Sequence, residues 1–287
     1  MDSSRKKALA LYAAKLRLLA LEGIYSAKSG HPGGSLSAAE ILTYLYQEEM
    51  NIDPANPRKP DRDRFVLSKG HVCPGLYAAL ALRGFFPTDA MKTLRKPDSI
   101  LQGHPDMRST PGVDMSSGSL GQGISAACGM ALSAKLSDNG YRVYALMGDG
   151  ELQEGQCWEA FMFAAHYKLD NLCAIIDKNE LQIDGKVSDV MGIDCIAEKY
   201  RAFNWHVIEL DGHDPQAIHD AFDAAKKVKG RPTVLVAHTV KGKGVSFMEA
   251  GGHAWHGRVP TAHELDLALA ELAESARQEG GDSCECD

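Results

Sequence analysis

Apolar residues follow two different spacings along this chain, and the two spacings alternate. Leu9, Leu16, Leu19 and Ile24 recur at helical spacing and predict a long amphipathic first helix that ends at Gly30. Short apolar runs farther on predict buried strands at 65–67, 143–147, 172–176, 205–210 and 233–237. Helical patterns separate most of these runs, at 75–82, 123–136, 158–165, 194–201 and 215–227. This alternation predicts the α/β class, with a parallel sheet covered by helices on both faces.

The remaining segments predict a capped helix, a loop and a final helix. Ser37, followed three residues later by Glu40, has the spacing of a capping box and predicts the start of a second helix. Residues 241–258 are rich in glycine and predict a loop. A leucine repeat after residue 260 marks the last helix. We therefore expect one domain at 1–260, followed by a C-terminal helix and acidic tail at 261–287.

Composition and charge narrow the classes of function. The chain of 287 residues is 44% apolar and 24% charged, as is usual for a globular protein, and its formal net charge is −7. This acidic balance argues against nucleic acid or an anionic membrane as a partner. No apolar run is long enough to span a bilayer, and the N-terminus mixes charged residues with its leucines, unlike a signal peptide. We expect a cytoplasmic protein.

The cysteines indicate neither a disulfide framework nor a metal site. There are seven, an odd number, and most lie in apolar or loop segments, so free thiols in a reducing compartment are expected. Cys284 and Cys286 form one close pair in the acidic tail. Together with His253 and His256 they match no common zinc spacing.

The chain changes from apolar to polar at the ends of two neighbouring predicted strands. One run stops at Gly-Asp-Gly, residues 148–150, and the next ends in Asp-Lys-Asn, residues 177–179. Because the carboxyl ends of parallel strands meet at one edge of a sheet, we expect Asp149 and Asn179 to lie close together there. The glycines let the backbone approach an anion closely, and the following helix offers unpaired N–H groups. The pattern predicts a phosphate pocket.

The same two side chains predict a site for a divalent metal. Magnesium binds oxygen ligands and usually takes a carboxylate, a neutral oxygen and substrate phosphates. Asp149, the side chain of Asn179 and a backbone carbonyl such as that of Leu181 meet this description. The alternative is an ordinary strand turn, in which Asp149 only caps the following helix.

Three histidines stand in loops bounded by glycine or proline: His31, His71 and His104. One loop histidine is often structural or solvated, but three in such loops fit convergence on one site. Imidazole suits proton transfer there because its pKa lies near neutrality. The glycine-rich segment 116–123 either cradles a ligand or simply forms a turn, and its sequence leaves both interpretations open.

Taken together, the motifs resemble a known family. The order SGHPGG, SKGH, GHP, SSGSLGQG, GDGELQEG, DKNELQIDG, DGHD and HAWHG is similar to that in the N-terminal, diphosphate-binding half of transketolases, over roughly residues 9–260. The resemblance implies the thiamine diphosphate-binding fold of the diphosphate domain. It also implies transfer of a two-carbon glycolaldehyde unit from a ketose to an aldose, or between their phosphates, with thiamine diphosphate as the cofactor.

The resemblance assigns metal and cofactor contacts to single positions. Asp149, Asn179 and the Leu181 carbonyl match the ligands of Mg²⁺, or of Ca²⁺ or Mn²⁺ in its place. The implied cofactor contacts are His71, Gly118, Leu120, Gly150, Asn179 and His256. Ser119 departs from the proline that the family often has, and this change leaves the neighbouring glycine intact.

The resemblance also assigns residues to the sugar and to a subunit interface. His31, His104 and His256 match the histidines that surround the reacting sugar. Glu154 matches a carboxylate in a network that links paired cofactor sites, and Glu159 matches an acidic residue of the interface.

A partner chain is a further expectation from the resemblance. The sequence stops where a full-length transketolase continues into the pyrimidine-binding domain, which supplies the carboxylate for the cofactor's aminopyrimidine and the arginines for sugar phosphate. We therefore expect the N-terminal subunit of a split transketolase. It should be active only with a C-terminal subunit, in an assembly with two copies of each chain.

Rival functions remain at this point. One is another thiamine enzyme, either a chain like deoxyxylulose-phosphate synthase or the α subunit of a 2-oxoacid dehydrogenase. Another is a cofactor-binding module without catalysis. A nicotinamide enzyme is disfavoured because no Gly-x-Gly-x-x-Gly follows the first strand.

Overall fold

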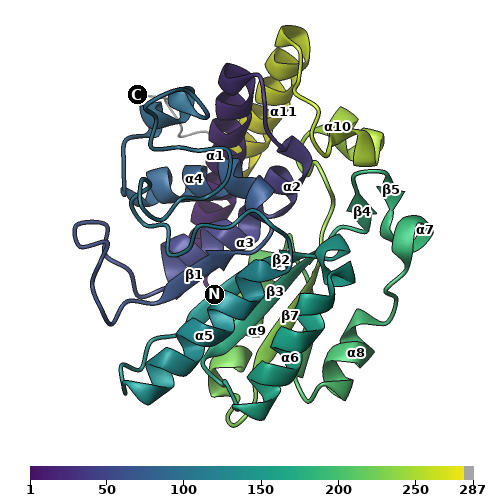
Figure 1. The fold of residues 1–287 in the computed structure, drawn as a ribbon. Coiled ribbons are helices and arrows are strands. Elements are labelled where there is room, and N and C mark those ends of the chain that lie inside the picture. The colour runs from purple at the N-terminus through teal and green to yellow at the C-terminus, as the bar shows by residue number, and fades with distance from the viewer. Residues whose placement is uncertain (281–287) are drawn as a thin grey trace.

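A parallel five-stranded sheet forms the centre of the protein, whose computed structural model describes residues 1–280 (Figure 1). The strand order is β1-β2-β3-β7-β6, and every neighbouring pair is parallel. The strands are β1 (Arg64–Leu67), β2 (Val143–Gly148), β3 (Leu172–Lys178), β6 (His206–Asp211) and β7 (Thr233–His238). All five lie where apolar runs predict them, so the α/β fold with a parallel sheet is confirmed.

Helices cover both faces of this sheet, because successive strand residues point to opposite sides. Val143, Ala145 and Met147 of β2 pack against one group of helices, while Tyr144 and Leu146 pack against the other. The first group is α5 (Gln122–Leu136), α6 (Gly155–His166) and α8 (Ile196–Ala202). The second is α1 (Ser3–Ala27), α3 (Ala39–Tyr44), α4 (Cys73–Arg83) and α9 (Pro215–Lys227).

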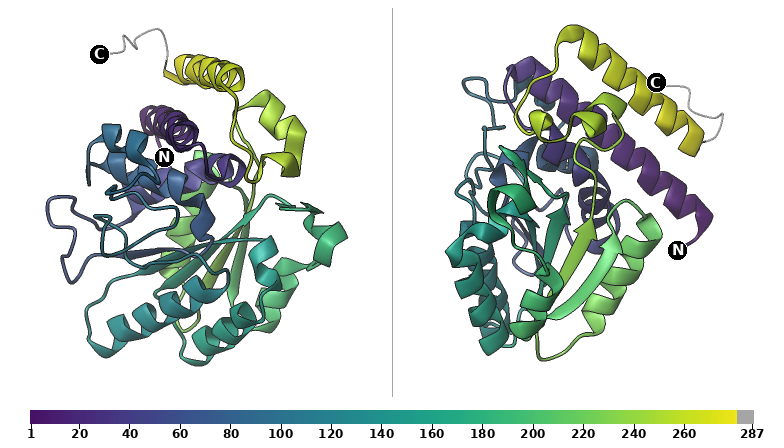
Figure 2. Two further views of the ribbon diagram at one scale, coloured as in Figure 1. Left: turned by 45° about the horizontal axis from the view of Figure 1, so that its top comes forward. Right: turned by 90° about the vertical axis from the view of Figure 1, so that its right-hand side faces the viewer.

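The C-terminal segments pack beside the first helix (Figure 2). Met248 in α10 (Ser246–Gly251) and Leu272 in α11 (Ala262–Gly280) join a small buried cluster with Leu21 of α1. The expected final helix therefore forms and lies along α1, whereas a separate unit from residue 261 onward stays a prediction. The acidic tail, with Cys284 and Cys286, lies outside the described residues.

The predicted capping box at Ser37 is wrong. Ser37 is the last residue of α2 (Pro32–Ser37), and α3 begins after Ala38 without a side-chain cap. The Ser37 hydroxyl donates to the carboxylate of Asp177, 2.6 Å away, and Glu40 binds Arg17 at 2.6 Å. Both side chains bind residues that are distant in sequence, and these contacts replace the capping hydrogen bonds that the local pattern predicts.

Short elements escape the sequence patterns. The predicted loop at 241–258 contains α10 and a 3-10 helix at Gly252–Trp255. After β3 the chain forms a two-stranded hairpin, β4 (Leu181–Gln182) with β5 (Gly185–Lys186), and then α7 (Val187–Met191). Two-residue strands and one-turn helices are too short to show a period. The other short helices are α2, Leu45–Glu49, Gly70–Val72 and Gly150–Gln153. A further one, Thr88–Thr93, lies where the sequence predicts a short helix, at 87–94.

Candidate cofactor and metal site

The carboxyl edge of the sheet holds the predicted acidic turn. Gly148 at the end of β2 pairs with Asp177 of β3. Asp149 and Asn179 therefore both lie close to the carboxyl ends of these neighbouring strands. Asp149 is buried, and its carboxylate accepts hydrogen bonds from the backbone N–H groups of Gly150, at 2.8 Å, and Glu180, at 2.5 Å. Burial, with the nearby charge of Asp177, raises the pKa of Asp149 to about 6. A cation bound to this carboxylate would lower the free-energy cost of burying its negative charge.

The other two predicted ligands, Asn179 and Leu181, flank Glu180, whose backbone N–H binds Asp149. The Oδ1 atom of Asn179 accepts from the Leu181 backbone N–H at 3.2 Å, while its Nδ2 donates to Asp177 at 2.9 Å. The Leu181 carbonyl accepts from the ammonium of Lys241 at 2.8 Å, so this oxygen already faces a positive charge. Residues 1–280 contain no cluster of three His, Cys, Asp or Glu side chains that could hold a metal. A carboxylate, an amide oxygen and a carbonyl nevertheless suit a hard cation such as Mg²⁺.

One cavity of about 410 Å³ joins these groups to the other predicted positions. Its lining includes the proposed metal ligands together with His31, His71, Gly118, Leu120, Gly150, Glu154 and His256. Gly118 lies close beside His104, since a Cβ atom on Gly118 would be 3.3 Å from the ring of His104. Glu154 and every residue predicted to bind the metal, the cofactor or the sugar therefore line the cavity or, like His104, adjoin it. Glu159 instead lies exposed on α6.

Three imidazoles meet in this cavity from three separate segments of the chain. The ring centroids of His31, His71 and His256 lie 5.0, 5.1 and 5.3 Å apart. Burial, followed by nearby cationic side chains, lowers the pKa of His31 to about 4 and that of His256 to about 3, and it holds the pKa of His71 well below its usual range. All three rings are therefore neutral at pH 7. Burial also lowers the pKa of the fourth histidine, His104.

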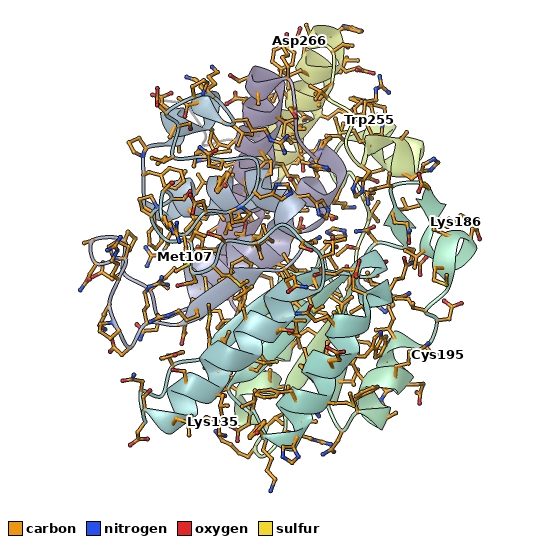
Figure 3. All side chains as sticks on the ribbon, viewed as in Figure 1. Met107, Lys135, Lys186, Cys195, Trp255 and Asp266 are labelled. Atoms are coloured by element: carbon orange, nitrogen blue, oxygen red, sulfur yellow. The ribbon has the colours of Figure 1, made fainter. Side chains whose placement is uncertain are left out.

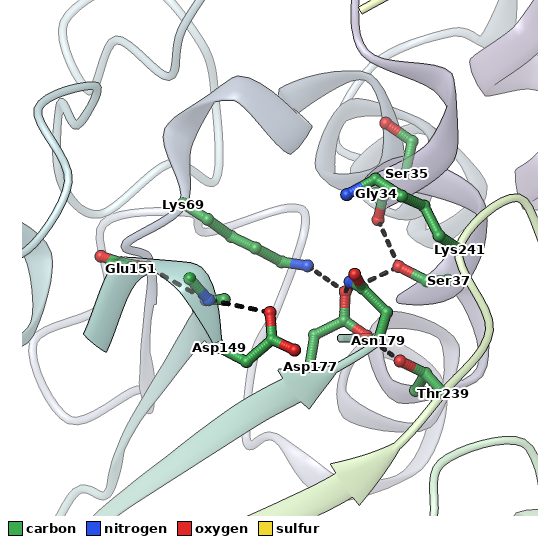
Figure 4. Close-up of polar contacts among 12 residues, drawn as sticks. Gly34, Ser35, Ser37, Lys69, Asp149, Glu151, Asp177, Asn179, Thr239 and Lys241 are labelled. Atoms are coloured by element: carbon green, nitrogen blue, oxygen red, sulfur yellow. Dashed lines mark hydrogen bonds and ion pairs between the residues drawn. The ribbon is translucent and has the colours of Figure 1, made fainter. Parts of the chain in front are cut away.

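Two buried lysines are functional candidates that the sequence patterns do not single out. Lys69 and Lys241 both line the cavity and are only 2% and 4% exposed. Lys69 forms an ion pair with Asp177, which is fully buried (Figure 4). Burial opposes the charge of Asp177, but the Lys69 ammonium and neighbouring hydroxyl donors outweigh it and lower the pKa of this carboxyl. Burial lowers the pKa of Lys241 to about 8. Both lysines therefore bring a positive charge to the lining of the cavity.

Two buried carboxylates position the loops around the cavity. Asp177 accepts hydrogen bonds from Ser37 and Thr239 as well as from Lys69 and Asn179. Glu151 accepts from the Ser68 hydroxyl and from two backbone N–H groups, those of Gly121 at 2.9 Å and Gly148 at 3.0 Å. Each carboxylate thus ties together loops that are far apart in sequence. In the sequence, these two carboxylates are visible only as acidic residues next to predicted strand ends.

Asp177→Ala should lower the free energy of unfolding by about 3–5 kcal/mol, because it leaves the Lys69 ammonium buried without its partner. Urea denaturation measures this change. Asp266→Ala, at an exposed position of α11, is the matched control and should change stability by less than about 0.5 kcal/mol. Equal stabilities for the two variants would show that Asp177 does not hold the loops together.

The known proteins that are similar to this chain point to one family. The family model described as "Transketolase, thiamine diphosphate binding domain" matches residues 9–275. The chain is 48% identical over 257 residues to a subunit of the 6-deoxy-6-sulfo-D-fructose transketolase of Clostridium sp. strain MSTE9, covering 90% of this chain and 93% of that protein. It is 43% identical over 266 residues to one subunit of the apulose-4-phosphate transketolase of Phocaeicola vulgatus, covering 93% of this chain and 94% of that protein.

A solved structure extends the likeness to three dimensions. The transketolase of Leishmania mexicana superimposes with a TM-score of 0.84 at 32% identity, covering 94% of this chain and 45% of that one. This chain therefore spans less than half the length of that full transketolase.

Proposed function

Because this chain belongs to the transketolase family, whose thiamine diphosphate-binding domain it contains, we propose that it is the cofactor-binding N-terminal subunit of a two-subunit transketolase. In this role it takes part in transferring a two-carbon glycolaldehyde unit from a ketose, or its phosphate, to an aldose. One observation carries the proposal: Asp149, Asn179 and the Leu181 carbonyl share a single cavity with three neutral imidazoles.

The relatives that are named as subunits support a two-chain enzyme. This chain covers 93% and 94% of two such subunits, but only 43% of the mouse transketolase, to which it is 43% identical. The match is therefore almost end to end with these subunits but partial with a full transketolase. A C-terminal subunit would supply the pyrimidine-binding half.

The cavity residues divide into a group for the metal and a group for the cofactor. Asp149, Asn179 and the Leu181 carbonyl would hold a divalent cation such as Mg²⁺, Ca²⁺ or Mn²⁺. The backbone at Gly118, Leu120 and Gly150, together with His71, His256 and the ammonium groups of Lys69 and Lys241, would hold the diphosphate. When bound, thiamine diphosphate supplies the electron sink for breaking the carbon–carbon bond next to a ketose carbonyl.

The histidines would handle the sugar. His31 Nδ1 is buried and has no hydrogen-bond partner within the described part of the chain, as expected of an atom whose partner arrives with a ligand. A neutral imidazole both donates and accepts, so His31, His104 and His256 can bind sugar hydroxyls and pass protons to and from them. Glu154 is an exposed residue of the cavity lining, and the family resemblance places it in a network toward a second cofactor site.

His31→Ala and His104→Ala should each lower turnover by about 10²–10⁴-fold while sparing cofactor affinity, because these rings are proposed to serve the sugar. Steady-state kinetics of the reconstituted enzyme and calorimetric titration with the cofactor measure the two quantities. His263→Ala, at an exposed position near the start of α11, is the control. Loss of cofactor affinity in either variant would show that its role is misassigned.

The experiment that tests the proposed reaction compares donors. A transketolase consumes a ketose phosphate, whereas a deoxyxylulose-phosphate-synthase-like enzyme or a 2-oxoacid dehydrogenase consumes pyruvate or a related oxoacid. Three imidazoles in one cavity favour the hydroxyl-rich sugar. Product analysis with each donor should show glycolaldehyde transfer from the ketose phosphate only, and turnover of pyruvate alone would contradict the proposal.

The surface of α6 is the proposed contact with the partner. Met162, Phe163 and Tyr167 are exposed there, near Glu154 and Glu159. Large apolar side chains clustered on one helix are typical of a surface that another chain covers.

We propose a cytoplasmic location and an assembly with two copies of each chain. None of the helices within residues 1–280 is long and apolar enough to cross a membrane.

A further inference from the structure

A second large hollow lies away from the cofactor cavity. It has a volume of about 870 Å³ and shares no lining residue with that cavity. Two segments form it. One is the loop before β1, with Arg58 and Arg62, together with Arg64 at the start of that strand. The other is the loop at 107–114, on which Figure 3 labels Met107. We call this hollow the arginine groove, because Arg108 brings its lining to four arginines.

The arginines outnumber the carboxylates around this groove. Asp114 is the one acidic residue of the lining, which leaves an excess of three positive charges in a chain whose net charge is −7. Asp114 is buried, and it already binds the guanidinium of Arg62 and, at 2.9 Å, the backbone N–H of Phe65. Its Oδ1 atom also lies 3.8 Å from Arg64 Nε, so in the described chain Asp114 pairs with Arg62 and Arg64 and with neither Arg58 nor Arg108.

Two of the arginines are fixed and two are free to bind. Arg62 is only 6% exposed, and its Nε atom is buried without a hydrogen-bond partner in the described chain. Arg64 donates to the Pro60 carbonyl at 2.9 Å and stacks 4.8 Å from the ring centroid of Tyr141. Arg58 and Arg108 are exposed, and within residues 1–280 their side chains form no ion pair closer than 4.0 Å.

The neighbouring acidic side chains are occupied elsewhere. Asp61 pairs with Lys59 at 3.2 Å, and Asp63 accepts from the backbone N–H groups of Asn51 and Arg142. Asp106 accepts from the Arg108 backbone N–H and from the hydroxyls of Ser109 and Ser116. No free carboxylate among these is left to fill the groove. Within residues 1–280 these carboxylates form no ion pair with the exposed Arg58 or Arg108.

We propose that the arginine groove binds a small phosphorylated anion, either inorganic phosphate or a phosphate ester. Guanidinium groups bind phosphate oxygens through paired, charge-assisted hydrogen bonds. The exposed Arg58 and Arg108, beside the unpartnered Nε of Arg62, provide such donors from both segments of the groove. The loop that carries Arg108 begins just after His104 and ends just before Gly118, and the hydrogen bond from Ser117 N–H to the Pro105 carbonyl closes its base at 3.3 Å. An anion in the groove therefore contacts a loop whose two ends adjoin the cofactor cavity.

The test is calorimetric titration of the full chain with inorganic phosphate, and in parallel with glycerol 3-phosphate, at constant ionic strength. The double variant Arg58→Gln/Arg108→Gln should bind phosphate about tenfold or more weakly than the unmodified chain, since two charge-assisted donor groups are lost. Both residues are exposed, so the variant should keep the thermal midpoint of the unmodified chain. Glycerol 3-phosphate distinguishes an ester site from one for the free ion.

Two controls make the result specific. Lys227→Gln/Lys229→Gln removes the same charge at exposed positions around the end of α9 and should leave phosphate affinity unchanged. Lys241→Gln removes a cation from the cofactor cavity and should leave intact the part of the binding that the arginine variant loses. Equal phosphate affinity in the arginine variant and the unmodified chain would overturn the proposal. So would an equal loss in the lysine pair, because the effect would then follow net charge alone.

Discussion

Replacing Asp149 with alanine should abolish magnesium-dependent binding of thiamine diphosphate while leaving the chain folded. Asp149 is the only carboxylate in the proposed ligand set, and Asn179 and the Leu181 carbonyl are uncharged. Losing an outer contact to a metal ligand already costs about 10–100-fold in metal affinity, so losing the charged ligand should cost more than about a hundredfold. Burial raises the pKa of Asp149 to about 6, which shows that the folded chain disfavours this lone charge. Removing this charge should offset part of the cost of losing the hydrogen bonds from Gly150 and Glu180, so the chain should stay folded.

Calorimetric titration with cofactor and Mg²⁺ measures the loss, and circular dichroism checks the fold. Asp184→Ala is the matched control, because Asp184 lines the same cavity but is exposed. The control should bind the cofactor as the unmodified chain does. Unchanged affinity in a folded Asp149→Ala variant would eliminate the metal assignment.

Mixing this chain with a C-terminal transketolase subunit should produce an assembly with two copies of each chain, while the chain by itself should self-associate or dissolve poorly. The reason is the exposed apolar surface of α6, where Phe163 is 37% and Met162 56% exposed. Sedimentation velocity distinguishes these states from a 31.0 kDa monomer.

A charged residue on α6 should weaken this assembly. Phe163→Asp should raise its dissociation constant by about tenfold or more, because a buried Phe contributes about 1.5–3 kcal/mol and a buried charge costs more. Leu267→Asp on α11 is the control, since Leu267 is equally apolar and 45% exposed. If both variants assemble like the unmodified chain, α6 is not the contact surface.

The fold, and the position of the proposed metal ligands at one edge of the sheet, could be predicted because their signals are local. Strand ends are visible as changes from apolar to polar residues, and parallel pairing then brings Asp149 and Asn179 to one edge. A histidine in a glycine-rich loop is equally visible, although only the order of the motifs indicates that His31, His71 and His256 meet.

The remaining site residues depend on contacts between distant segments. Asp177 and Lys69 are 108 residues apart in sequence, and Asp177 and Ser37 are 140 apart, so no local spacing links them. The Ser37 prediction fails for the same reason, because a serine before a helical pattern is a cap only if nothing farther away binds its hydroxyl. Lys241 lies in a stretch whose glycines predict a loop, and only the fold turns its ammonium toward the Leu181 carbonyl.

The measurement that tests the central claim most directly is an assay of glycolaldehyde transfer from a ketose phosphate to an aldose phosphate, with thiamine diphosphate and Mg²⁺ present. The assay is run with only this chain, with only a C-terminal transketolase subunit, and with both. We predict transfer only in the mixture, and none when Asp149→Ala replaces the unmodified chain. Full activity from this chain alone would contradict the two-subunit account, and no activity from the mixture with any ketose donor would favour a cofactor-binding module without catalysis.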